Sequence, residues 1–413
     1  MTSATLDVET LRKDFPLLAR TVHGRPLVYL DSASSSLQPR PVLVAMEQYY
    51  ETCHANVHRG VYTTAEEATA HYEGARMSVG RFVGAPDPER EIVFTKNATE
   101  ALNLVANSWG TKNLRPGDAV LLTEMEHHAN LVPWLMLAKR AGIELRYLSV
   151  DGDGRLDLSD LDRKLEGVKI VGVSAMSNVL GTIPPVRKIA DAAHAAGALV
   201  VADGAQAVPH FPVDVAVLGV DFLAFSAHKM LGPTGIGALW GRAELLDAMP
   251  PFLGGGGMIL EVRLDRFLPA EPPHRFEAGT PPIAEAVGFA AAVDYMESLG
   301  MPQVRAHEEK LTEYAMDALA DRLGDDCTVF GPPPGPDRGG VLSIGFRDVH
   351  PHDLAQVLDQ YGVCVRPGHH CAKPLMRVLG VTATARASIG PYNDEQDIDT
   401  LIEGLAEAGR LFA

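Results

Sequence analysis

The chain has 413 residues, 46% of them hydrophobic, so it can bury a large core, and its length favours two or three domains. Its formal net charge of −17, from 53 acidic and 36 basic residues, argues against nucleic acid or an anionic membrane as the main partner. The four cysteines form no CxxC pair, no apolar stretch approaches a membrane span, and residues 1–9 lack a signal-peptide pattern, which together predict a cytoplasmic protein with free thiols.

Short β-branched runs alternate with helical stretches through the first three hundred residues. This alternation predicts an α/β fold with a mainly parallel sheet covered by helices. The runs expected to form strands are 92–94, 120–122, 145–148, 170–173, 199–202 and 222–225. Ligands bind beyond the carboxyl ends of such strands, so Thr95, Asp203 and Ser226, which lie at those ends, are the first site candidates.

The alternation stops at residues 269–282, which are rich in Pro and Gly and precede an Ala-rich helix near 284–298. A smaller unit follows, with a helix after Pro302, strands at 341–346 and 363–365, and a closing amphipathic helix from Asp394. We therefore predict a large domain over residues 20–298. Residues 299–413, together with 1–19, are predicted to form a small α+β domain.

Lys229, in Ser226-Ala227-His228-Lys229, is the most informative residue of the chain. A lysine at the mouth of an α/β sheet can form a Schiff base with an aldehyde, and a carboxylate such as Asp203 can keep a pyridine nitrogen protonated. Either residue alone is more often a solvated strand end or a turn former. The pair, with Ser226 and His228 beside the lysine, predicts a site for pyridoxal 5'-phosphate (PLP).

Other polar residues at strand ends suit the same cofactor. Gln206 is placed to hydrogen-bond the ring phenolate, and His127 to stack on the ring; the alternatives for His127 are a solvated loop residue or, with His128, a metal ligand. Asn97-Ala98-Thr99-Glu100 is typical of a helix start, where free N–H groups and the Thr99 hydroxyl can bind a phosphate. A simple helix cap is the alternative.

Cys371 ends the segment Arg366-Pro367-Gly368-His369-His370-Cys371. Two histidines and an arginine favour the thiolate, so Cys371 is a candidate nucleophile, although a buried inert cysteine is the alternative. Consecutive residues rarely direct three ligands at one ion and no fourth ligand is evident, so we expect no metal. Arg386 carries a planar guanidinium whose two-pronged geometry suits a carboxylate. Without the other site residues, an arginine at this position would more often form a surface salt bridge.

With these segments in place, the sequence resembles the PLP-dependent class V aminotransferase family and, within it, the group II (SUF-system) cysteine desulfurases. The resemblance covers nearly the whole chain. It rests on seven motifs in order, at 95–100, 125–130, 177–181, 203–206, 226–229, 275–281 and 366–371. It implies the PLP-dependent transferase fold of type I.

The resemblance also implies roles for individual residues. The residues implied to hold PLP are Lys229, Asp203, Gln206, His127, Thr99, Ser226, His228 and, from a partner subunit, Thr280. Those implied to contact the substrate L-cysteine are Arg386, Asn178, Arg366 and His58. The residues implied to act in catalysis are Lys229 as the base, His127, and Cys371 as the acceptor of sulfur.

The implied reaction converts L-cysteine to L-alanine and leaves a persulfide on Cys371. The loop before Cys371 resembles the short, ordered version of the group II enzymes, which implies a homodimer that passes sulfur to a dedicated SUF-system acceptor for iron–sulfur cluster assembly. The open alternatives are selenocysteine lyase, another class V PLP activity, or a scaffold without the chemistry. Ser34, where the family usually has Ala, and Tyr62, where His is common, depart from its pattern near the expected substrate entrance.

Overall fold

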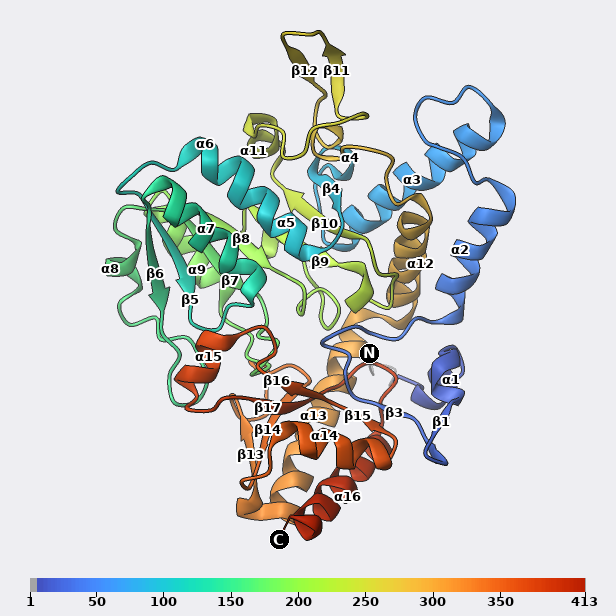
Figure 1. Cartoon of the computed structure of the whole chain (residues 1–413), viewed down its shortest axis with the longest axis vertical. Helices are drawn as coiled ribbons and strands as arrows, with labels where there is room; N and C mark the ends of the chain where they lie inside the picture. Colours follow the sequence, from blue (N-terminus) through green and yellow to red (C-terminus); the bar gives the residue numbers. More distant parts are fainter. Residues whose placement is uncertain (1–5, 413) are drawn as a thin grey trace, which may run out of the picture.

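The computed structural model describes residues 6–412 and is built around a seven-stranded sheet (Figure 1). Its strand order is β4-β10-β9-β8-β7-β5-β6. The strands are β4 (Ile92–Thr95), β5 (Ala119–Thr123), β6 (Glu144–Leu148), β7 (Val168–Ser174), β8 (Leu199–Asp203), β9 (Phe222–Ser226) and β10 (Gly237–Gly241). All six predicted strands are confirmed. β10 was not predicted, and it lies antiparallel between β4 and β9.

Successive residues of a strand point to opposite sides of the sheet, and here the residues on both sides are apolar and buried. Helices therefore cover both faces of this sheet. Leu121 packs in one buried cluster with Ile189, whereas its neighbours Val120 and Leu122 pack in another with Trp134. The first cluster includes residues of α3 (Thr63–Phe82), α9 (Val186–Ala195) and α12 (Ile283–Leu299). The second includes residues of α5 (Ala98–Leu104) and α7 (Val132–Ala141). The predicted α/β class is therefore confirmed.

The C-terminal part forms a second, antiparallel sheet in the order β13-β14-β17-β16, which lies at the lower end of the molecule in Figure 1. Its strands are β13 (Cys327–Phe330), β14 (Val341–Phe346), β16 (Arg366–Gly368) and β17 (Thr384–Ser388). Its helices are α13 (Met301–Leu323), α14 (Pro351–Gln360) and α16 (Glu395–Leu411). As predicted, the closing helix begins after Asp394, whose side chain accepts a hydrogen bond from the backbone N–H of Asp397.

The N-terminal segment contacts this C-terminal part. Arg12, at the end of α1 (Val8–Arg12), donates to Asp397 at 2.9 Å, and β3 (Val28–Tyr29) pairs in parallel with β15 (Val363–Cys364). Leu30 packs in the C-terminal core. Val28 and Leu30 thus share that core, although the predicted boundary assigned them to the large domain. Residues 1–5 and 413 of the predicted small domain lie outside the described residues, and the division at 298/299 stays a prediction.

A hairpin of β11 (Ile259–Val262) and β12 (Phe267–Pro269) projects from the upper end of the molecule in Figure 1. Further strands are β1 (Thr21–Val22) and β2 (Arg25–Pro26). Further helices are α2 (Arg40–Thr52), α4 (Pro88–Glu91), α6 (Thr111–Asn113), α8 (Leu161–Leu165), α10 (Val215–Leu218), α11 (Ala243–Ala248) and α15 (Lys373–Val378). Within residues 6–412, no helix has the length and apolar character needed to cross a membrane.

Candidate active site

A cavity of about 200 Å³ lies beyond the carboxyl ends of the sheet strands, where a ligand site was predicted. The predicted site residues that line it are Thr99, His127, Asn178, Asp203, Gln206, Ser226, His228, Lys229, Arg366, Cys371 and Arg386. They come from strands, loops and a helix start that are far apart in the sequence, and the two sheets bring them together. Two predicted site residues, Thr280 and His58, lie elsewhere.

Asp203 is buried, Lys229 is half-buried, and both line this cavity. Lys229 ends the single helical turn η4 (Ala227–Lys229), which follows β9 directly. Burial lowers the pKa of Lys229 to about 8, and the Asp203 carboxylate opposes this shift. Asp203 ends β8, accepts a hydrogen bond from the backbone N–H of Ala205 at 3.0 Å, and has a pKa raised by burial. An amine with a pKa near 8 is partly neutral at physiological pH and therefore nucleophilic.

His127 is an uncharged aromatic ring in this environment. Burial lowers its pKa to about 3, and the charge of Lys229 adds to the effect. Its Nδ1 accepts a hydrogen bond from the backbone N–H of Ala129 at 3.0 Å, which leaves the ring hydrogen on Nε2. A neutral, oriented imidazole suits the predicted stacking on a flat cofactor.

Glu126, beside His127, is a buried carboxylate that the sequence analysis missed as a site residue. It accepts hydrogen bonds from Thr123 Oγ1 at 2.6 Å, Asn130 Nδ2 at 2.7 Å and Ser174 Oγ at 2.8 Å. Burial raises its pKa to about 7. It joins the end of β5 and the loop that follows to the end of β7, where Ser174 lines the cavity. A charged residue inside motif 125–130, directly after a predicted strand, was the available signal.

The remaining polar groups of the cavity fit PLP. Gln206 donates from Nε2 to the Ala33 carbonyl at 2.7 Å, and its second amide hydrogen remains for a phenolate; its buried Oε1 has no hydrogen-bond partner. Ser226 Oγ accepts from the backbone N–H of Ala98 at 2.8 Å, so its own hydrogen can be donated to a phosphate. His228 has a pKa lowered to about 4 by burial, and Thr99 lies in the first turn of α5.

Cys371 is an exposed side chain on a tightly anchored loop. His370 and Cys371 have φ values of +51° and +55°. Residues other than glycine rarely adopt this left-handed backbone conformation unless surrounding contacts hold them in it. Asn178 Nδ2 donates to the His370 carbonyl, and the backbone N–H of His128 donates to the Cys371 carbonyl, both at 2.7 Å. His370 Nε2 lies 2.8 Å from Thr384 Oγ1. The thiol-bearing residue is thereby fixed beside the cavity.

The charge around Cys371 differs from the expectation that both neighbouring histidines favour its thiolate. Burial lowers the pKa of His370 to about 3, so this ring is neutral and supplies no positive charge. The cationic side chains that line the cavity with Cys371 are instead Lys229, Arg366 and Arg386. Arg386 is only 2% exposed; burial lowers its pKa to about 10, and its Nη1 donates to the Asn178 carbonyl at 2.9 Å.

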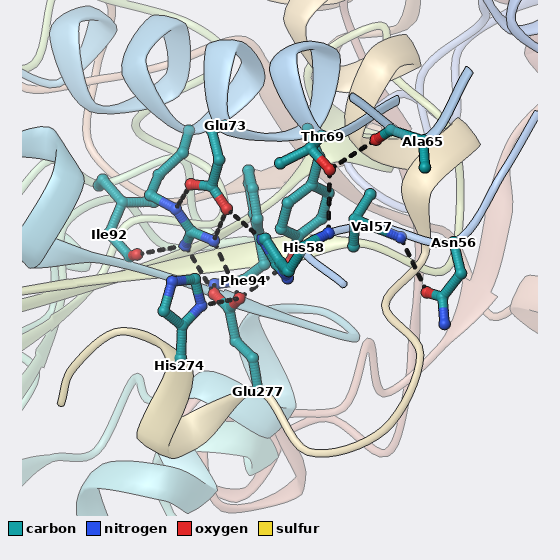
Figure 2. Close-up of polar contacts among 12 residues, drawn as sticks. Asn56, Val57, His58, Ala65, Thr69, Glu73, Ile92, Phe94, His274 and Glu277 are labelled. Carbon is teal, nitrogen blue, oxygen red and sulfur yellow. Dashed lines mark hydrogen bonds and ion pairs between the residues drawn. The ribbon is translucent and has the colours of Figure 1, made fainter. Parts of the chain in front are cut away.

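His58 and Thr280 lie away from Lys229 within one chain. The His58 Nε2 atom is 2.7 Å from Glu73 Oε1, and Figure 2 shows the two side chains beside α3; His58 does not line the Lys229 cavity. Both His58 and Thr280 line a different cavity of about 520 Å³. The two predicted residues that are missing from the first cavity therefore share a second one.

A buried ion-pair network holds the segment that carries Thr280. Arg76, which is fully buried, donates to Glu277 Oε1 at 2.6 Å and Oε2 at 2.9 Å, and to Glu73 Oε2 at 2.8 Å (Figure 2). Glu277 also accepts from the backbone N–H of Phe94 at 2.7 Å. Atoms of His58, Glu73 and His274 lie within 4.8 Å of one another, a spacing that a metal ion could bridge. Because Arg76 and His58 already engage Glu73, we interpret the cluster as part of this network.

The sheet topology and the lysine that lines the cavity at its edge define an α/β protein of the PLP-dependent fold type I. The chain belongs to the class-V aminotransferase family, whose model matches residues 28–401. A relative from Streptomyces coelicolor named probable cysteine desulfurase is 51% identical, with 98% of each chain covered. A cysteine desulfurase from Haloferax volcanii is 48% identical, covering 100% of this chain and 99% of the relative. The apo structure of a cysteine desulfurase from Thermococcus onnurineus NA1 matches with a TM-score of 0.93, 42% identity and 99% coverage of both chains.

Proposed function

We propose that this protein is a PLP-dependent cysteine desulfurase, which converts L-cysteine to L-alanine and retains the sulfur on Cys371. The observation that carries the proposal is that one cavity is lined by Lys229, Asp203, Arg386 and Cys371. An amine, a ring-nitrogen partner, a carboxylate receptor and a thiol thus lie within reach of one small ligand. The relatives named cysteine desulfurases, at 48–51% identity over nearly the whole chain, support the same activity.

The cofactor would be held by the residues that line the cavity floor. Lys229 would bind it covalently, Asp203 would pair with the ring nitrogen, Gln206 would donate to the phenolate, and His127 would stack on the ring. The residues that would hold its phosphate are Thr99, Ser226, His228 and the Thr280 of a partner chain. When bound, PLP supplies an aldehyde for amines and a ring that accepts electrons released at Cα. Once substrate has released Lys229 from the cofactor, its Nζ would be free to take up the Cα proton.

The substrate carboxylate would bind Arg386 and Asn178, with Arg366 at the cavity rim. The thiolate of Cys371 attacks the substrate sulfur, forming an S–S bond while the substrate C–S bond breaks. The electron pair of the broken bond stays on the substrate carbon, which is protonated to give L-alanine. One thiol and one cysteine therefore yield one persulfide and one alanine, with no external oxidant or reductant.

We further propose that the protein is a cytoplasmic homodimer of the group II, SUF-system type and that it delivers sulfur to a separate acceptor protein for iron–sulfur cluster assembly. The anchored Cys371 loop supports an acceptor that docks at the cavity, because the loop offers little slack for the persulfide to travel. The shared location of His58 and Thr280 on another face supports a partner chain whose active site these residues complete. We also propose that residues 20–298 form the large domain and that residues 299–413, with residues 1–19, form the small domain.

The deciding experiment replaces Cys371 with alanine and measures alanine release from L-cysteine. We expect turnover to fall by a factor of about 10² or more, as removal of a catalytic group commonly does. Cys327→Ala is the matched control, since burial raises the pKa of that thiol to about 12 and it should be unreactive. Undiminished turnover by Cys371→Ala rejects the proposal. Activity of that variant on selenocysteine alone would favour a selenocysteine lyase instead.

A further inference from the structure

The guanidinium of Arg386 is only partly satisfied by the protein. Its Nη1 donates to the Asn178 carbonyl, and its Nη2 donates to Ser34 Oγ at 2.6 Å and lies 3.3 Å from Asp31 Oδ1. Its Nε is buried and has no hydrogen-bond partner. Buried polar groups are nearly always hydrogen-bonded, so an unpaired donor on a residue that lines a cavity indicates that a bound group or a water completes its bonding there. A carboxylate oxygen supplies the acceptor that this site lacks.

Ser34 connects this arginine to a neighbouring carboxylate. Its hydroxyl accepts from Arg386 Nη2 and donates to Asp31 Oδ1 at 2.5 Å, and its side chain lines the same cavity as Lys229 and Cys371. A hydroxyl has a single hydrogen, which rotates to the best acceptor in reach. A ligand carboxylate on Arg386 brings a second acceptor close to Ser34 Oγ, because that oxygen is only 2.6 Å from the guanidinium.

Asp31 keeps other partners if the Ser34 hydroxyl turns away. Its Oδ2 lies 3.4 Å from Arg366 Nε, and its Oδ1 retains Arg386 Nη2. Two arginines and one aspartate carry a net charge of +1, which one substrate carboxylate neutralises. The cluster is therefore matched in charge to an amino acid with a single free carboxylate.

We propose that Ser34 is a further substrate-binding residue, whose hydroxyl turns from Asp31 to the substrate carboxylate when that carboxylate binds Arg386. The proposal rests on the proposed function, since it assigns the cavity to an amino-acid substrate. The carboxylate does not react, so Ser34 contributes equally to the bound substrate and to the transition state. Its loss therefore raises KM and leaves kcat nearly unchanged.

The test measures binding of two substrate fragments to the PLP-loaded enzyme by calorimetry. The fragment 3-mercaptopropionate keeps the carboxylate and the thiol, and cysteamine keeps the amine and the thiol. Ser34→Ala should raise the Kd of 3-mercaptopropionate about tenfold, the effect of losing one charge-assisted hydrogen bond. It should leave the Kd of cysteamine unchanged, and Ser34→Thr, which retains a hydroxyl, should restore carboxylate binding.

Ser35→Ala is the matched control, because Ser35 Oγ donates to the His228 carbonyl at 3.2 Å and does not contact Arg386. Unchanged binding of 3-mercaptopropionate to Ser34→Ala overturns the proposal, as does absence of binding to the unmodified enzyme or an equal loss for both fragments. These fragment measurements do not require turnover. If the enzyme fails to release alanine from L-cysteine, the proposed function fails while the carboxylate assignment is still decided by the fragments.

Discussion

Lys229 is the residue whose chemistry depends most on its neighbours. Burial lowers its pKa to about 8; Asp203 and Cys371 oppose the shift, and Arg386 and Arg366 reinforce it. The sequence predicted this lysine and most of the cavity lining because strand ends in a parallel sheet meet at one edge. It could not predict that Asp31 contacts both Arg366 and Arg386, since these contacts join residues separated by more than three hundred positions. Such contacts follow from the packed fold and leave no local pattern.

We expect the Lys229 amine of the cofactor-free protein to become reactive near pH 8, whereas an ordinary lysine does so near 10.4. Protonation blocks the amine, so its reactivity should rise with pH and be half-maximal near the lowered pKa. Competitive labelling with acetic anhydride, read by mass spectrometry of the Lys229 peptide, measures this midpoint against exposed lysines.

Asp203→Asn tests the assigned cause, because it removes a carboxylate that raises the pKa of Lys229. The labelling midpoint should then move below 8. A midpoint near that of exposed lysines, or an upward shift in the variant, would contradict the account of the electrostatics.

At the scale of elements, β10 shows where the sequence pattern fails. Gly237–Gly241 is fully buried, but it is short, begins and ends with glycine, and runs antiparallel to both neighbours. Gly237 must be small, since a Cβ there would lie 2.6 Å from the Phe225 carbonyl oxygen. Glycine is depleted in strands, so local propensity argued against an element that the neighbouring strands impose. β14, with six predominantly apolar residues, had the same bounds as predicted.

The Arg76–Glu277 pair ties α3 and β4 to the segment that carries Thr280, so we expect it to matter for stability. Glu277→Gln removes one charge of a buried pair and should lower the free energy of unfolding by about 3 kcal/mol. Equilibrium urea unfolding at a fixed protein concentration measures this loss.

Glu407→Gln provides the comparison, because the Arg410–Glu407 pair lies at the surface, with Arg410 exposed and Glu407 partly exposed, and should contribute less than about 0.5 kcal/mol. Equal effects of the two substitutions would show that the buried network has no special role. A much larger loss of PLP than of stability in Glu277→Gln would indicate that the Thr280 segment had moved.

At the scale of the whole molecule, the proposed homodimer makes a specific prediction about hybrid assemblies. Lys229→Ala and Thr280→Ala chains should each be poorly active alone. In a dimer of one with the other, a site formed between chains combines an intact Lys229 with the partner's intact Thr280. Co-expression of the two variants with different affinity tags, followed by isolation of hybrids, should therefore recover alanine production from one of the two sites.

If Thr280 acted within its own chain, every site of the hybrid would lack one of the two residues and no activity would return. A monomeric protein would give no hybrid to isolate. The same experiment therefore tests both the oligomer and the route by which Thr280 reaches the cofactor phosphate.

The anchoring of the Cys371 loop has a consequence for the kinetics of the whole pathway. Residues from three separate segments, Asn178, His128 and Thr384, hold the loop. Under the proposed function, the sulfur would therefore stay near the position where it is received. Delivery to the proposed acceptor would then be a bimolecular encounter, whose rate grows with the concentration of that protein. With cysteine in excess, the output of the enzyme would follow the supply of the acceptor, and sulfur release could be controlled without regulating the chemistry itself.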